Sequence, residues 1–338
     1  MQSAKWASMV ALSVVLVGGT ALFRNSTVSA QGRWGASYFT NLPLVTQDGK
    51  TVHFYDDVLK GKIVAINLIY THCQYSCPLE TARLVQVQKM LGDRVGKDIF
   101  FYSISIDPKR DTPKVLKAYA EQYHVGPGWT FLTGKKEDID LISKKLGLYS
   151  NPNSSKDGHY AQLLIGNEPM GQWMRNAATD NPRFLANQIG NLLGNWGSLD
   201  AASTPAPATA NPNNAAAAAG APFTLDRNNV GQYLYAKQCA ACHTIGHGDK
   251  IGPDLLGVTS VRDPAWLRRF ISAPEKMIAE KDPVATALFH KYKNLRMPNL
   301  RVGPDDLEAL IKFLASRSQN MTSGGVIRVA NPPQSTAK

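Results

Sequence analysis

Residues 63–78 read IVAINLIYTHCQYSCP, and this stretch decides the fold of the first half of the chain. Ile63–Tyr70 is a continuous apolar run rich in β-branched residues, which is typical of a strand buried on both faces of a sheet. Pro78 suits the first turn of a helix, and the apolar residues after it extend that helix to about Leu91. A strand that ends beside two cysteines and leads into a helix predicts an α/β domain.

Strand and helix signals continue to alternate beyond this unit. Ile99–Ile106 predicts a second buried strand, and Pro113 begins another helix, which we expect the Thr112 side chain to cap. The remaining predicted elements are a helix over Glu137–Leu146, a hairpin of Tyr160–Ile165 and Gly171–Met174 about the turn at 167–169, and a helix over Arg183–Leu193. The alternation predicts a thioredoxin-like α/β domain over residues 38–198.

An Ala/Pro-rich linker over residues 199–222 divides the chain. Eleven of the 23 residues at 200–222 are Ala and four are Pro, and none is large enough to form a core. A second domain is expected at 223–318, followed by a polar tail at 319–338. Because a tether of this length keeps two domains at a high local concentration, we expect them to meet transiently without needing a fixed interface.

The first 30 residues have the pattern of an export signal. Lys5 precedes the uncharged run Ala7–Phe23, and Val28-Ser29-Ala30 resembles a cleavage site of small residues. The run has 17 residues, the short end of what spans a bilayer, so both a cleaved signal peptide and a retained membrane anchor remain open. Either predicts a protein on the periplasmic side of the bacterial inner membrane, anchored or soluble.

Charge and cysteine content narrow the function classes. The chain of 338 residues carries 37 Lys and Arg against 26 Asp and Glu, a net charge of +11. This excess is spread out, with no dense basic run interleaved with aromatics, so the sequence argues against nucleic-acid binding and suits a membrane surface or an acidic protein partner. The four cysteines form two close pairs rather than a scattered disulfide framework, which indicates cofactor or redox chemistry.

The second cysteine pair predicts haem. Cys239-Ala240-Ala241-Cys242-His243 is a C-x-x-C-H motif, the signal for covalent attachment of c-type haem, in which both thiols bond to the porphyrin and the histidine binds the iron. Zinc would require a fourth ligand at finger spacing, and the chain has no further cysteine there. The surrounding segments predict helices, over Val230–Gln238, Pro264–Ile271, Pro283–Tyr292 and Asp305–Ser316, the last with the apolar stripe Leu307, Leu310, Ile311, Phe313 and Leu314.

Met297 is the candidate for the sixth iron ligand. It lies in a loop between Arg296 and Pro298, and Met277 is the alternative. With Gly252-Pro253 and the haem motif, residues 223–318 resemble a class I cytochrome c domain. The resemblance implies a small all-α fold and a low-spin haem with His/Met ligation, which raises the potential and passes single electrons.

The first cysteine pair predicts either copper binding or thiol redox chemistry. Cys73 and Cys77 lie where a strand leads into a helix, and the helix N-terminus stabilises thiolate. Two thiolates suit Cu(I), and an imidazole from His159 would complete a trigonal site. A structural disulfide between the cysteines, and a solvent-exposed loop position for His159, are the alternatives.

Residues 38–195 resemble the Sco (SenC-type) family of copper-handling proteins. The likeness rests on Tyr70-Thr71-His72-Cys73 through Cys77-Pro78, Ser105-Ile106-Asp107-Pro108, Arg110-Asp111-Thr112-Pro113 and His159. It implies that Cys73, Cys77 and His159 hold copper, that Asp107 shapes a partner-facing surface, and that His72 is no ligand. The implied partner is cytochrome c oxidase subunit II or another respiratory copper protein, which would receive copper or have its thiols kept reduced. Gln74 replaces the proline usual in the family.

Three functions follow from these sites. The first is a copper-binding assembly factor whose own haem exchanges single electrons with copper or with the oxidase as its electron-transfer partner. The others are a thiol–disulfide oxidoreductase acting through Cys73 and Cys77, and a plain electron carrier docked by its first domain. A thioredoxin-type disulfide has a potential near about −270 mV, so its reduction by a haem above 0 mV is uphill by roughly 12 kcal/mol for two electrons. Reduction of Cu(II) by one electron is better matched to such a haem.

Overall fold

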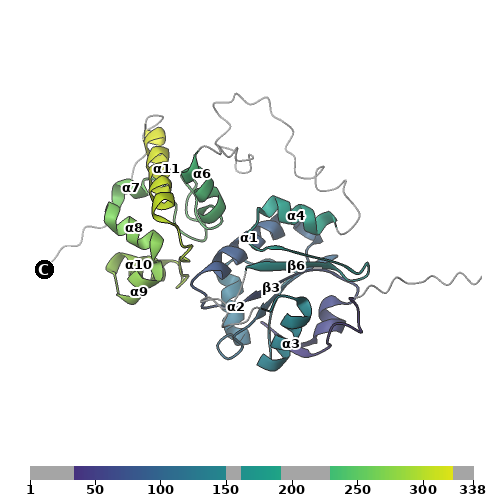
Figure 1. Ribbon diagram of the computed structural model, residues 1–338. Coiled ribbons are helices and arrows are strands. Elements are labelled where there is room, and N and C mark those ends of the chain that lie inside the picture. The colour runs from purple at the N-terminus through teal and green to yellow at the C-terminus, as the bar shows by residue number, and fades with distance from the viewer. Residues whose placement is uncertain (1–33, 150–160, 192–228, 323–338) are drawn as a thin grey trace, which may run out of the picture.

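The computed structural model describes residues 34–149, 161–191 and 229–322, which form two domains (Figure 1). The predicted segment at 1–30, the linker at 199–222 and His159 lie outside these residues. So does the tail from residue 323 on. None of the helices in the described ranges combines the length and apolar character that a membrane span requires.

The first domain is built on one seven-stranded sheet, with the strand order β2-β1-β5-β4-β3-β6-β7. β3, β4 and β5 run parallel, and the outer strands pair antiparallel to their neighbours. The strands are β1 (Pro43–Thr46), β2 (Thr51–His53), β3 (Ile63–Ile69), β4 (Ile99–Ser105), β5 (Trp129–Thr133), β6 (Gln162–Asn167) and β7 (Gln172–Ala177).

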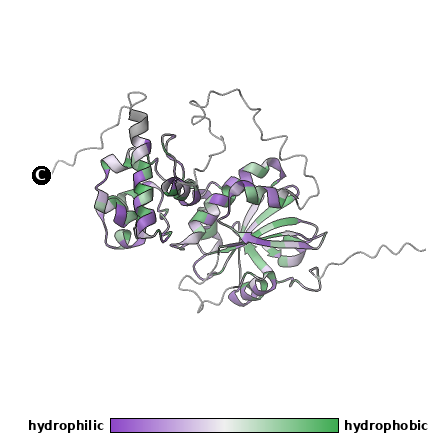
Figure 2. Ribbon diagram, turned by 45° about the horizontal axis from the view of Figure 1, so that its top comes forward, coloured by the Kyte–Doolittle hydropathy of each residue, from purple (hydrophilic) through white to green (hydrophobic). Residues whose placement is uncertain are grey.

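β3 lies in the interior of the sheet between β4 and β6, and all seven of its residues are buried. Its side chains alternate between two cores, one on each face of the sheet. The core that contains both cysteines is covered by α1 (Ser76–Leu91), α2 (Pro113–Gln122) and α4 (Pro182–Asn191), and the other by α3 (Lys136–Leu146) and the short η1 (Phe54–Leu59). Figure 2 shows the hydrophobic strands between helices of mixed character.

Most predicted elements of this domain are confirmed, including the hairpin, and the exceptions are local. β1, β2 and β5 were not predicted, because none of these strands exceeds five residues. α1 begins at Ser76, before Pro78, so Cys77 lies inside its first turn. The expected Thr112 cap is wrong: Thr112 occupies the N-cap position of α2 but its side chain makes no capping bond. Pro113 follows it, and its ring already fixes the first turn and removes one donor.

The second domain contains only helices among its described residues. They are α6 (Val230–Leu234), η3 (Tyr235–Cys239), α7 (Val258–Val261), α8 (Pro264–Ser272), α9 (Pro274–Ala279), α10 (Pro283–Lys291) and α11 (Pro304–Thr322). The first predicted helix changes to a wider π-helical turn at Tyr235, and α7 and α9 were not predicted. Four of the five residues in the predicted apolar stripe on α11 are buried, and the fifth, Ile311, is partly buried and packs against the same core.

α6 crosses α11 at a glycine. A Cβ placed on Gly231 would lie 2.0 Å from the carbonyl oxygen of Ala309, which is part of the α11 backbone. Because a backbone atom cannot move aside as a side chain does, the two helices approach this closely only with glycine at this position. The contact places the end of η3, where Cys239 lies, against the final helix.

Gly231→Ala is therefore expected to destabilise the second domain by about 1–3 kcal/mol, the usual range for overpacking a tight contact. Urea unfolding of the full chain followed by far-UV circular dichroism measures the change. Gly35→Ala is the control, since nothing lies within 4 Å of the added methyl group there. Equal stability of the two variants would contradict the close crossing.

Candidate metal centres

The cysteine pair lies in the loop between β3 and α1. Cys73 is 4% and Cys77 is 0% exposed, and both are free thiols rather than a disulfide. The two sulfurs are hydrogen-bonded to each other. The backbone amide of Cys73 donates to the carbonyl oxygen of Tyr70 at 3.2 Å, which closes the turn that follows β3.

The two thiols have different acidities. The Cys77 thiol and the backbone amides of Cys77 and Tyr75 donate to the sulfur of Cys73, and these bonds lower the pKa of Cys73 to about 6 against the opposing effect of burial. Burial and the neighbouring Cys73 sulfur raise the pKa of Cys77 well above its ordinary value. Near neutral pH the pair therefore holds one thiolate, which accepts a hydrogen bond from one thiol.

A buried polar network lies beneath the pair. Glu80 is 0% exposed, and Asn67 donates to its carboxyl group at 3.4 Å. Ser103 donates to Asn67 at 2.7 Å, and the Trp129 indole donates to Ser103 at 2.9 Å. Burial raises the pKa of Glu80 to about 8, so the group is protonated at neutral pH. Sequence reasoning missed Glu80, and the polar Asn67 within an apolar strand was the available signal.

The cysteine loop is anchored by Asp111. Its carboxylate is 0% exposed and accepts bonds from the Thr71 amide at 3.1 Å, the Thr71 hydroxyl at 2.5 Å and the Ser105 hydroxyl at 2.6 Å. Thr71 follows β3 and Ser105 ends β4, so one side chain joins the ends of both central strands. The sequence indicated Asp111 only as part of a motif.

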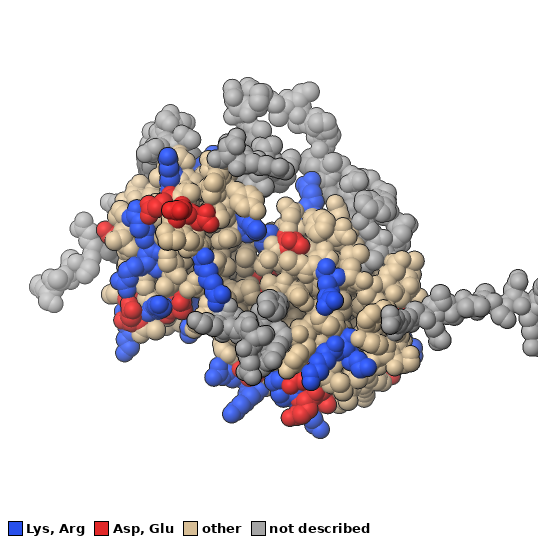
Figure 3. Space-filling view, in the orientation of Figure 1, with Lys and Arg blue, Asp and Glu red and all other residues tan. Residues whose placement is uncertain are grey.

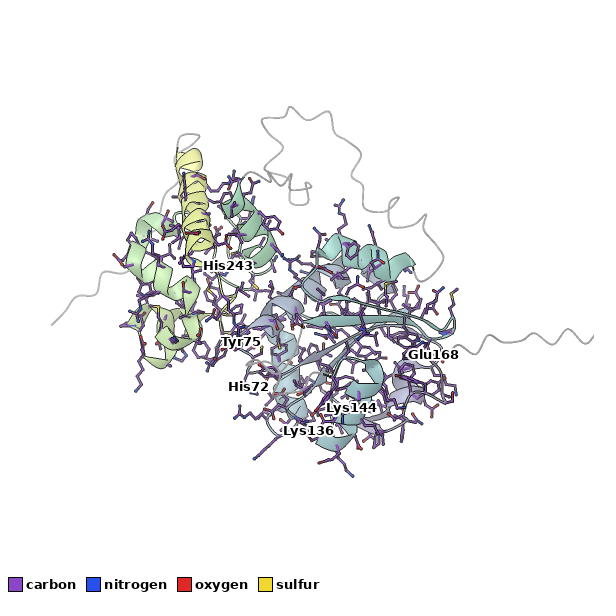
Figure 4. All side chains as sticks on the ribbon, in the orientation of Figure 1. His72, Tyr75, Lys136, Lys144, Glu168 and His243 are labelled. Carbon is purple, nitrogen blue, oxygen red and sulfur yellow. The ribbon has the colours of Figure 1, made fainter. Side chains whose placement is uncertain are left out.

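The His72 side chain is paired with Asp107 rather than with the cysteine sulfurs. Its Nε2 lies 3.5 Å from Asp107, and its ring packs edge-on against Tyr70 with the centroids 4.9 Å apart. The His72 side chain is 40% and the Asp107 side chain 32% exposed, and Figure 4 shows His72 on the first domain, below Tyr75. That His72 is no copper ligand stays a prediction.

The third predicted copper ligand is not described. Within the described ranges, no group of three His, Cys, Asp or Glu side chains is arranged to hold a metal ion. His159 lies three residues before β6, and the register pairs Leu163 of β6 with Asn67 of β3. β6 therefore starts at the edge of the sheet where β3 leads to Cys73. Three residues reach about 10 Å at most, and His159 stays a prediction.

The second centre is organised by His243. Its Nδ1 lies 2.8 Å from the carbonyl oxygen of Pro253, and a bond donated by Nδ1–H leaves the Nε2 lone pair for a metal. Burial lowers the pKa of His243, which favours the neutral imidazole that binds metals. A Cβ on Gly252 would lie 2.7 Å from the ring, so glycine lets the backbone pack directly against the imidazole.

His243 and Met297 line the same two adjoining cavities, of about 600 and 840 Å³. Cys242 lines the first and Cys239 the second, while Met277 lines neither and is a buried residue of α9. The other lining side chains are mostly apolar, among them Phe270, Leu288 and Leu310. Two thiols, an imidazole and a thioether around apolar space fit a covalently held haem, and the geometry favours Met297 over Met277 as the predicted sixth ligand.

Comparison with known proteins agrees with this division of the chain. Residues 33–165 match the SCO1/SenC family model, and residues 229–318 match the cytochrome c family model. An SCO2-like protein of Rickettsia conorii is 33% identical over 158 residues, which cover 43% of this chain and 74% of that protein. The chain spans about half the length of SCO homologues from Bacillus subtilis and Rickettsia prowazekii.

Two solved structures resemble the two domains. The copper-bound ScoI structure from Bradyrhizobium japonicum is 25% identical and covers 46% of this chain and 99% of its own, with a TM-score of 0.39. The cytochrome c domain of the pp3183 protein from Pseudomonas putida is 42% identical and covers 28% of this chain and 92% of its own, with a TM-score of 0.26. From the family-model matches and the Rickettsia relative, we conclude that the chain belongs to the SCO1/SenC family and that a cytochrome c domain follows its thioredoxin-like Sco domain.

Proposed function

We propose that this protein is a copper-binding assembly factor for cytochrome c oxidase that carries its own covalent haem for one-electron transfer. Copper is the cargo, held by Cys73, Cys77 and His159. The recipient is the dinuclear copper centre of oxidase subunit II or a similar respiratory copper protein. The observation that carries the proposal is a buried pair of free cysteines that share a hydrogen bond, in the same molecule as two adjoining cavities lined by Cys239 or Cys242 together with His243 and Met297.

The chain's own residues prepare both sites. The Asp111 anchor fixes the loop before a metal arrives, and burial of both sulfurs excludes water and favours a soft ion over a hydrated hard one. At the second site Cys239 and Cys242 would hold the haem and Pro253 orients His243. A haem ligated by His243 and Met297 supplies reversible one-electron transfer at a raised potential. One-electron transfer matches the Cu(II)/Cu(I) couple better than it matches the two-electron reduction of a disulfide.

Location is part of the proposal. We place the protein on the periplasmic side of the bacterial inner membrane, with residues 1–30 either cleaved as a signal peptide or kept as an anchor. The sequence pattern of that segment supports it. Positive and negative side chains are scattered over the visible face of both domains (Figure 3), which suits a membrane surface or a protein partner more than nucleic acid.

Thiol–disulfide exchange through Cys73 and Cys77 is the second candidate function. It is favoured by the low pKa of Cys73 beside a protonated thiol, the asymmetry that redox-active pairs use. Metal content separates the two functions: purified protein that reduces a partner disulfide stoichiometrically but binds no copper supports exchange.

Copper binding should require both sulfurs. Soluble full-length protein is expected to bind one Cu(I) at the first domain, and Cys73→Ser or Cys77→Ser should reduce binding to background, since one thiolate and one imidazole leave Cu(I) under-coordinated. Competition with a chromophoric Cu(I) chelator measures the affinity. His72→Ala is the matched control and should bind normally, because His72 pairs with Asp107. Stoichiometric copper in protein lacking both thiols would refute the site.

Haem ligation should depend on Met297. Met297→Ala is expected to lower the reduction potential and remove any methionine–iron charge-transfer band, while the haem stays attached to the denatured chain. Optical redox titration measures the potential. Met277→Leu, which preserves volume in the core, should change neither property. If Met277→Leu removes the band and Met297→Ala does not, the assignment of the sixth ligand is wrong.

A further inference from the structure

The two domains are docked through polar contacts that connect distant parts of the chain. Arg83 of α1, which is buried, donates to the carbonyl oxygens of Lys237 and, at 3.1 Å, of Asp180. At the end of α2, Gln122 donates to the carbonyl oxygen of Lys293 at 2.8 Å. A buried guanidinium shared by two backbone carbonyls indicates a formed interface rather than a passing encounter.

The interface also has an apolar part, formed by the haem motif itself. Ala241, between the two haem-motif cysteines, is buried in the same core as Cys77 of the first domain. Cys242, Ile251 and Leu295 pack against that core from the second domain. The helix that begins at the first cysteine pair therefore lies against the segment that carries the second pair, as Figure 1 shows for α1 and the neighbouring helical domain.

The first domain forms part of the wall of the predicted haem cavity. Pro78 and Tyr123 line the cavity of about 600 Å³ that Cys242, His243 and Met297 also line. Pro78 directly follows Cys77, and Tyr123 packs on Tyr119 with ring centroids 4.7 Å apart. Sequence reasoning assigned neither residue a role at the haem, because each lies in the other domain from the haem motif.

The loop that carries Met297 is attached to the loop between Cys73 and Cys77. The backbone amide of Asn299 donates to the carbonyl oxygen of Gln74 at 2.8 Å. The guanidinium of Arg301 lies over the ring of Tyr75, 4.8 Å from its centroid. Both contacts join residues next to the first cysteine pair with residues two and four positions after Met297. Figure 4 shows Tyr75 between the two domains, on the side of His243.

We propose that the haem site is shared between the domains, with Pro78 and Tyr123 completing its wall and the Gln74–Tyr75 loop holding the Met297 loop in place. This rests on the proposed function only in requiring that haem is bound. An apolar wall excludes water from the haem edge and so disfavours the oxidised, more positive iron. A substitution in the Sco domain is therefore expected to change the potential of a haem bound to the other domain.

The test compares two tyrosines of the Sco domain in the full-length protein without copper. Tyr75 contacts Arg301 across the interface, whereas Tyr149 makes a similar contact, 5.0 Å from the ring centroid, with Lys144 of its own domain. Tyr75→Ala is expected to shift the ratio of reduced to oxidised haem at a given potential at least tenfold toward oxidised, a fall of about 59 mV. Tyr149→Ala should leave the potential unchanged.

Hydrogen exchange measured by mass spectrometry supplies a second readout. The Asn299 amide should be protected in the wild type and in Tyr149→Ala, and should exchange faster in Tyr75→Ala. A potential and an exchange rate that are the same in both tyrosine variants overturn the shared site while leaving the proposed function intact. A chain without covalent haem would overturn both, and the optical spectrum of the same samples identifies that outcome.

Discussion

The bonds that the buried Asp111 carboxylate accepts from Thr71 and Ser105 are the constraint on which the site depends. β3 and β4 are parallel neighbours, so both end at the same edge of the sheet, where backbone groups must find partners outside the ladder. Asp111 accepts from the backbone amide and the hydroxyl of Thr71 on the β3 side and from the side-chain hydroxyl of Ser105 on the β4 side. The turn that follows is fixed on this anchor, and with it Cys73, the first turn of α1 and the interface that α1 presents to the second domain.

The unequal acidity of the cysteine pair follows from that placement. The two sulfurs share one hydrogen bond, and the amides at the start of α1 stabilise charge on Cys73, whereas Cys77 lies deeper, against the buried Glu80. A deprotonated Glu80 would add a second negative charge in a medium of low polarity. Its raised pKa keeps that carboxyl group neutral, so the buried region holds a single thiolate near neutral pH. A soft monovalent cation is suited to such a region, because it compensates the charge.

The elements and sites that could be predicted from the sequence are those whose signal lies within a short stretch of chain, either as a regular pattern of apolar residues or as a motif of chemically distinctive residues. The long apolar runs of β3 and β4, the helices after them and both cysteine motifs carry their own signals within a few residues. Short strands such as β5 do not, because their pairing depends on β1 and β4, which are distant in the chain. The same limit applies to the site. Glu80 and Asp111 act through burial, and Tyr123 acquires its role only because another domain lies against it, which no local pattern records.

Docking changes how the tether between the domains is understood. A linker alone would give two sites that meet by diffusion, and each encounter would have to find its orientation anew. With Asn299 bonded to Gln74 and the haem motif packed on the core that contains Cys77, the orientation is already set. Transfer of an electron needs no atoms to cross such an interface, so burial of the cysteine pair does not oppose it. Transfer of copper to another protein, in contrast, needs access to the sulfurs. The proposed function thus places two different demands on one buried pair, and the docked arrangement suits the demand of electron transfer better than that of copper transfer.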